Sequence, residues 1–158
     1  MSDAEREREP APLQTIPAIL NRIDAAWREL MQALDAIPAG RLAEPGPSGD
    51  WSITDLYGHL AFWDEHAVQE LGRARTGLPR QDNEWQAMNE ADHAARQGQS
   101  LDVQRAAMHR AHGRLLERLR GEADANAARI DVATRPDTYL HYEEHLPDVR
   151  EWRQRAGI

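Results

Sequence analysis

Apolar and polar residues alternate at helical spacing along most of the chain, which predicts long amphipathic helices. In the first of these, Thr15 is the N-cap, and apolar residues recur every three to four positions until Pro38 ends the pattern. The second helix is expected to begin at Ser52, with Asp55 three residues later in the position of a capping box. It ends before Gly77.

The second half of the chain repeats this pattern. A short helical piece is expected over residues 83–97, and a third long helix follows from Ser100 to Gly121. A loop is expected over residues 121–136, and a last helix from about residue 137 to residue 156. Pro147 lies inside this last helix and predicts a kink, or an end and restart, just after His145.

No segment has the alternation of a β-strand, so the expected fold is all-α. Four amphipathic helices with one long connection between the second and third predict a four-helix bundle with a long crossover connection. The length of 158 residues suits a single domain, expected over residues 15–158. Residues 1–14 are a charged leader that we expect to be frayed or disordered.

Composition excludes several classes of protein. No apolar run is long enough to span a bilayer, and the charged first dozen residues do not resemble a secretory signal. We therefore expect a cytoplasmic protein without a membrane partner. With 27 acidic and 19 basic residues, the net charge of −8 argues against a nucleic-acid partner.

The chain contains no lysine and no cysteine. This excludes a Schiff-base lysine, a phosphate-loop lysine, a thiolate nucleophile, a disulfide and a cysteine-ligated metal or cluster. The seven histidines are the chemically informative residues that remain.

His141 and His145 are four residues apart and lie on one helix face, together with Val149 and Trp152. Two imidazoles pointing into a bundle are costly to bury unless each ring nitrogen has a partner, and a metal ion is such a partner. Hydrogen bonds to neighbouring residues are the alternative. Residue 142 is a tyrosine, not the glutamate that a zinc-peptidase motif requires.

His59 lies near the middle of the second helix, at the edge of its apolar face. A third imidazole from a facing helix completes a three-histidine site with open coordination positions, which is the arrangement of a catalytic zinc. His59 is alternatively a core-edge histidine with hydrogen-bonded partners. His112 and His109 on the third long helix are rival ligands, and helical periodicity does not choose between them.

Several neighbours of these histidines are candidates for a pocket or for supporting the ligands. Asp55, one turn before His59, either orients that imidazole or acts only as a helix cap. We expect Tyr57, Trp63, His66 and Tyr142 to shape a pocket. The tryptophans are most simply interpreted as core or rim aromatics, and a pocket for a flat substrate is the alternative use for Trp51, Trp63, Trp85 and Trp152. His93 is interpreted as a solvated side chain.

Three segments resemble the DinB-like four-helix-bundle superfamily. GDWSITDLYGHLAFWDEH resembles its second-helix signature, TYLHYEEHLPDVREW resembles its last helix with two histidines four apart, and NEWQAMNEADHAARQGQSL resembles its short helix and connector. The likeness covers most of residues 15–156. Pro147 departs from the uninterrupted last helix of that superfamily.

This resemblance implies a bundle with a long crossover, often dimeric, and a divalent metal held by His59, His141 and His145. Imidazole ligands suit zinc and nickel equally well. Characterised relatives are similar to transferases and isomerases that use low-molecular-weight thiols such as mycothiol or bacillithiol. One branch resembles colibactin-resistance proteins that open a cyclopropane without needing the metal.

The expected function is therefore a metal-dependent enzyme that adds an exogenous thiol, or metal-bound hydroxide, to a small electrophilic substrate. The chain has no covalent nucleophile of its own among lysines and cysteines. Two alternatives stay open: a non-catalytic, stress-associated protein that binds a ligand or a metal, and a metal-independent hydrolase of the resistance type.

Overall fold

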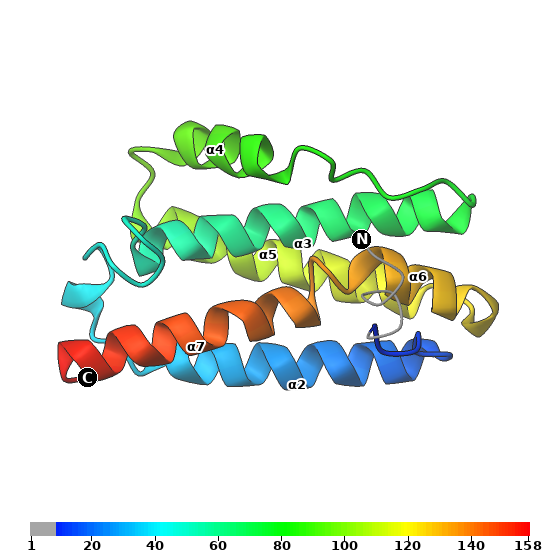
Figure 1. Cartoon of the computed structure of the whole chain (residues 1–158), viewed down its shortest axis with the longest axis horizontal. Coiled ribbons are helices and arrows are strands. Elements are labelled where there is room, and N and C mark those ends of the chain that lie inside the picture. Colours follow the sequence, from blue (N-terminus) through cyan, green and yellow to red (C-terminus); the bar gives the residue numbers. More distant parts are fainter. Residues whose placement is uncertain (1–8) are drawn as a thin grey trace.

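The computed structural model describes residues 9–158, and its helices pack into a four-column bundle (Figure 1). The columns are α2 (Ile16–Asp35), α3 (Ile53–Arg75), α5 (Leu101–Arg120) and the consecutive pair α6 (Ala127–Thr134) and α7 (Tyr139–Ala156). No β-strand occurs in this part of the chain, where the only bridge is the isolated pair Ser48–Trp51. The all-α bundle is thus confirmed.

The connection between α3 and α5 is the predicted crossover. Because the chain returns along the outside of the bundle before α5 begins, α3 and α5 run in the same direction, and α2 and α7 run opposite to them (Figure 1). The return segment carries α4 (Trp85–Arg96), which packs on α3 and has no buried residue of its own. The 3₁₀ turns η1 (Ala39–Arg41) and η2 (Asp124–Asn126) complete the order.

The predicted caps begin the helices. The hydroxyls of Thr15 and Ser100 accept hydrogen bonds from backbone N–H groups three residues on, at 3.2 Å in both cases. Ser52 and Asp55 form a reciprocal capping box, in which the carboxylate accepts the Ser52 backbone N–H at 2.9 Å. These local interactions fix the starts of α2, α3 and α5.

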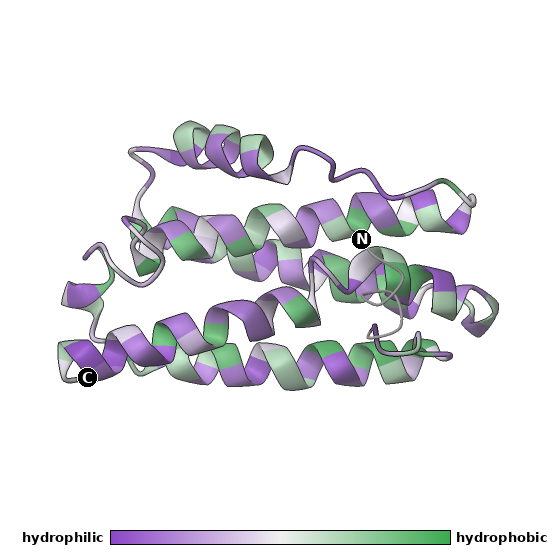
Figure 2. Ribbon diagram, in the orientation of Figure 1, coloured by the Kyte–Doolittle hydropathy of each residue, from purple (hydrophilic) through white to green (hydrophobic). Residues whose placement is uncertain are grey.

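The interior is filled by the apolar faces that helical spacing predicts. Along each long helix hydrophobic and hydrophilic residues alternate in the pattern of an amphipathic segment (Figure 2). The largest fully buried side chains come from all the columns of the bundle: Ile19, Ile23, Leu30, Leu34, Ile53, Leu56, Tyr57, Leu60, Met108, Leu115 and Tyr142. No helix of residues 9–158 combines the length and apolar character needed to cross a bilayer.

A small residue on α3 allows α4 and α5 to approach closely. A β-carbon at Gly58 would lie 2.2 Å from Oε1 of Gln104 on α5 and 2.6 Å from Cδ of Arg96 on α4. Glycine at this position therefore makes room for both side chains beside α3, one residue before His59.

One expectation for the last third of the chain is wrong, and one of the two alternatives for Pro147 is excluded. Residues 127–134 form the helix α6 where a loop was predicted, because Ala127, Ile130 and Ala133 provide a buried face that packs on α3. The last helix contains Pro147 and is nevertheless continuous to residue 156, so it does not end and restart there.

Part of the leader is held against α6. The guanidinium of Arg135 donates to the Pro10 carbonyl at 2.8 Å, and the Leu13 backbone N–H donates to Asp131 at 3.0 Å. Residues 9–14 are irregular and make these two hydrogen bonds, and the expected fraying of this stretch stays a prediction. The same expectation for residues 1–8 lies outside the described residues.

Candidate metal centre

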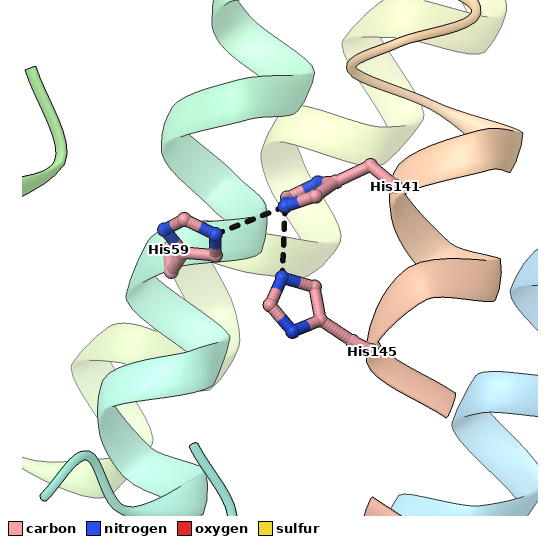
Figure 3. Close-up of side chains that lie close together, drawn as sticks. All are labelled: His59, His141 and His145. Carbon is pink, nitrogen blue, oxygen red and sulfur yellow. Dashed lines mark hydrogen bonds between the residues drawn. The ribbon is translucent and has the colours of Figure 1, made fainter. Parts of the chain in front are cut away.

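Three imidazoles converge between α3 and α7 and form the histidine trio: His59, His141 and His145 (Figure 3). Nε2 of His141 lies 2.9 Å from Nε2 of His59 and 2.9 Å from Nε2 of His145. One ligand atom from each residue lies within 4.8 Å of the others. The i,i+4 spacing on α7 was predicted from the sequence, and the packing of α3 against that face supplies the third ring.

The two distances of 2.9 Å from Nε2 of His141 suit imidazoles that share a single divalent ion. Two imidazoles bound at about 2.0–2.1 Å to one ion, at coordination angles between about 90° and 110°, place their nitrogens about 2.9–3.4 Å apart. Without a cation, His141 Nε2 faces two other imidazole nitrogens, and neutral rings provide at most one N–H each for these contacts. A group of lone pairs converging on one point is the donor set that zinc or nickel binds.

Burial keeps the three imidazoles neutral, which is the form in which a histidine binds a metal. Desolvation lowers the pKa of His59 to about 3, with further lowering by the nearby charges of His145 and Arg96. Burial likewise lowers the pKa of His145 to about 4 and that of His141 well below its usual value. The second nitrogen of His141, Nδ1, makes no well-formed hydrogen bond. The backbone carbonyl of Asp137, one turn earlier, is the acceptor beside it.

The trio opens onto a pocket of about 540 Å³. Its aromatic wall consists of Trp51, Trp63 and Trp85, and its polar lining includes Asn89, which accepts a hydrogen bond from the indole of Trp63 at 2.8 Å. The pocket is thus lined by three tryptophans, Trp51, Trp63 and Trp85, for which the sequence left a pocket open as an alternative to the core or its rim.

Arg80 and Asp137 form a charged wall of the same pocket. The guanidinium of Arg80 donates two hydrogen bonds to Asp137, one at 2.8 Å, and a third to Asp82 at 2.8 Å. His66 lies behind this wall, with Nδ1 2.8 Å from Asp137 and Nε2 3.0 Å from the Gln81 carbonyl. His66 therefore supports the wall from inside the protein rather than lining the pocket.

Three other candidates lie away from the pocket. Tyr57 is buried in the core under the guanidinium of Arg105. His112 and Tyr142 both contact Asp64 on α3, with His112 Nδ1 3.1 Å from its carboxylate and the Tyr142 hydroxyl donating to it. His112, the main rival ligand, consequently is not part of the trio, and His109 lies exposed outside it.

Asp55 is a cap and makes no hydrogen bond to His59. One of its oxygens belongs to the capping box, and the other lies 3.3 Å from Nε2 of His93. The His93 ring stacks on Trp51, with centroids 4.5 Å apart and an interplanar angle of 13°. His93 was expected to be solvated and is instead part of the support of the aromatic wall.

Sequence reasoning did not select Arg80, Asp82, Asn89, Asp137 or Glu144, all of which line the pocket. Arg80 and Asp82 lie in an irregular segment without periodicity, and Asn89 and Glu144 lie on helix faces that are polar in any bundle. Only Asp137, one turn before His141, carried a usable signal, since that spacing places it on the face of the ligands.

The fold and the trio define a DinB-like helical bundle with a candidate metal centre. Residues 23–145 match the family model described as the mycothiol maleylpyruvate isomerase N-terminal domain, and the chain belongs to this family. No curated protein matches the sequence.

Two solved structures have similar folds. An uncharacterised protein from Escherichia coli UTI89 is 16% identical with a TM-score of 0.75, covering 93% of this chain and 97% of its own. The colibactin self-resistance protein ClbS, solved in complex with a double-stranded DNA, is 13% identical with a TM-score of 0.72, covering 88% of this chain and 95% of its own. At these identities the likeness concerns the fold alone.

Proposed function

We propose that the protein is a metal-dependent enzyme in which His59, His141 and His145 bind one divalent ion, zinc or nickel. Its reaction is the addition of an exogenous low-molecular-weight thiol, or of water, to a small electrophilic substrate. The observation that carries the proposal is the convergence of three neutral imidazoles, two of them buried and one half-buried, at the wall of an open pocket. The family description, which names a mycothiol-dependent isomerase, supports the thiol.

The metal would supply Lewis acidity and lower the pKa of the nucleophile. The residues of the chain bind the metal and the substrate and orient them. His141 would be oriented by the Asp137 carbonyl, and the Arg80–Asp137 pair holds the segment around residues 80–82 against the start of α7. Trp51, Trp63 and Trp85 provide apolar contact area for a substrate and keep water from part of the pocket. The nucleophile comes from solution, since the chain has no cysteine and no lysine.

Metal content of untagged protein tests the site. Wild type purified without a histidine tag should contain close to one equivalent of zinc or nickel by mass spectrometry. A His141→Ala/His145→Ala double variant should contain almost none. His109→Ala is the matched control, because it removes an exposed imidazole outside the trio and should leave the metal content unchanged. Equal metal in wild type and the double variant would refute the site.

Turnover is tested with a thiol panel. Mycothiol, bacillithiol and glutathione, each with a small electrophile that carries no carboxylate, should react faster in the presence of zinc-loaded protein than with chelator-treated protein. A rate that is unaffected by chelation but exceeds the uncatalysed rate indicates the metal-independent hydrolase alternative instead. Binding of metal without any rate enhancement indicates a ligand- or metal-binding protein.

We further propose that this chain does not bind DNA, although its structural neighbour ClbS was solved with a double-stranded DNA. The net charge of −8 repels a phosphate backbone, and many arginines pair with acids, as in Arg28–Asp24 and Arg155–Glu151. A fluorescent DNA duplex should show no anisotropy change with micromolar protein at 150 mM salt. A salt-sensitive increase in anisotropy would contradict this.

A further inference from the structure

The charged residues that line the pocket carry a net negative charge. Among the described residues the lining contains three carboxylates, Asp82, Asp137 and Glu144, and one guanidinium, Arg80. A divalent ion on the trio would bring the net charge of the pocket lining to about zero and would not make it positive.

Arg80 is not available to anchor an anionic substrate. Its Nε donates to Asp82, one Nη1 hydrogen donates to the Ala133 carbonyl at 2.7 Å, and Asp137 accepts from both terminal nitrogens. Four of the five N–H groups of the guanidinium are thus used within the protein. Its charge is matched by two carboxylates, so it serves to fasten the loop to α6 and α7.

The acidic group at the mouth of the pocket is free of such a partner. Glu144 on α7 is exposed, lines the pocket beside the trio, and has no ion pair within residues 9–158. By contrast, the neighbouring Glu143 pairs with Arg22 on α2. A carboxylate that faces a cavity without a cation attracts a positively charged group of the occupant.

The aromatic wall has the composition that binds such a group. Indole rings attract cations through their faces, and three of them border one cavity here. Trp85 has 53% of its surface exposed, although it lies on α4 in the face that also carries Asn89 toward the pocket. A large indole exposed at the mouth of a cavity gains contact area when a flat ligand stacks on it.

We propose that the pocket binds a flat organic cation, an aromatic or conjugated ring system with a positively charged nitrogen, stacked on the indoles of Trp51, Trp63 and Trp85 with its charge toward Glu144. This names the substrate class of the proposed enzyme and rests on the proposed function in taking this pocket as the substrate site. It excludes substrates that depend on a carboxylate for recognition by the protein itself.

Three bicyclic probes of similar size and different charge test the proposal. They are 1-methylquinolinium, neutral quinoline and quinoline-6-carboxylate, titrated by calorimetry into metal-free wild-type protein at pH 7.5. The cation should bind about tenfold or more tightly than the carboxylate, with quinoline between them. Equal affinity for cation and carboxylate, or no binding of the cation at millimolar concentration, would overturn the proposal.

Variants distinguish attraction of the probe by the pocket from attraction by the overall charge of the protein. Glu144→Gln should weaken binding of the cation about 2–5-fold, as expected for one exposed charge pair, and leave quinoline unaffected. Glu117→Gln removes an exposed carboxylate on α5, outside the pocket lining, and should change nothing. Trp85→Ala should weaken both probes about tenfold. An equal effect of Glu117→Gln and Glu144→Gln would show that only the net charge attracts the probe.

Zinc uptake, measured after zinc is added to a second portion of the same metal-free preparation, distinguishes this inference from the proposed function. Protein that binds zinc through the trio but not the quinolinium cation refutes the substrate class and leaves the metal centre in place. Protein that binds the cation in its pocket but takes up no zinc refutes the metal-dependent reaction and retains the binding site. In zinc-loaded protein the preference for the cation should narrow, because two positive charges join the pocket.

Discussion

The bundle contains two polar clusters with buried histidines, and the polar atoms of the two clusters find their partners in different ways. In the histidine trio, imidazole nitrogens face one another at 2.9 Å without a carboxylate between them. In what we call the core network, Asp64, His112 and Tyr142, one imidazole meets a carboxylate at 3.1 Å and a tyrosine hydroxyl at 3.3 Å. The trio borders the pocket, whereas Asp64 and Tyr142 are fully enclosed.

This difference indicates which buried histidines need a ligand from outside the protein. In the core network the protein itself satisfies the polar atoms, and Trp27 stacks on the His112 ring with centroids 3.6 Å apart. Burial raises the pKa of the Asp64 carboxyl, and hydrogen bonds from His112 and Tyr142 oppose that rise. In the trio no protein group of opposite character is present, so a cation from outside completes the set. The core network should therefore govern stability, and the trio metal binding.

The largest effect is expected from removing the centre of the core network. Asp64→Ala leaves the Tyr142 hydroxyl and the His112 ring buried without their shared partner, and should lower the free energy of unfolding by about 3–5 kcal/mol. Urea denaturation of metal-free protein measures this loss. Asp64→Asn keeps one acceptor oxygen and should lose less. An Asp64→Ala variant as stable as wild type would contradict the structural role of the network.

The second prediction concerns the histidine trio, where a substitution should affect stabilisation by the metal. At a free zinc concentration of 100 times the dissociation constant, zinc should stabilise wild type by about 2.7 kcal/mol. His141→Ala removes the ligand that contacts both other imidazoles and should abolish this gain. Thermal unfolding with and without zinc measures it. Full zinc stabilisation in the variant would show that the metal binds elsewhere.

The smallest effect is expected for the rival histidine. His112→Ala removes one hydrogen bond to Asp64 and the stacking contact with Trp27, so it should lower the free energy of unfolding by about 1–2 kcal/mol. Zinc should stabilise this variant as much as it does wild type. If His112→Ala loses zinc stabilisation while His141→Ala keeps it, the roles of the two clusters are reversed.

Much of the fold was predictable because helices depend on local sequence. The caps at Thr15, Ser52 and Ser100 and the apolar periodicity predicted α2, α3 and α5 to within a residue or two at their starts. The helix α6 was missed. It has only eight residues, its apolar face is short, and polar residues such as Asp131 and Thr134 are buried within it, so only its packing on α3 reveals it.

Part of the candidate metal centre was likewise predictable from the sequence, and part was not. The spacing of His141 and His145 places both rings on one face of a helix, since backbone geometry alone fixes the angle between residues four apart. Periodicity did not separate His59 from His112, because each lies on an inward face of its own helix. Packing of the bundle places His59 of α3 beside His141 of α7. His112 instead contacts Asp64 of α3 and so lies outside the trio.

The particular residues of the pocket depend entirely on the tertiary arrangement. Arg80, Asn89, Asp137 and Glu144 come from the crossover segment, α4, the turn before α7, and α7 itself. Helix boundaries, charge and the absence of lysine and cysteine follow from the order of residues, because each depends on neighbours along the chain or on composition. Which side chains share a cavity, and which carboxylate there lacks a partner, depends on distances between segments far apart in the chain, and these exist only once the helices have packed.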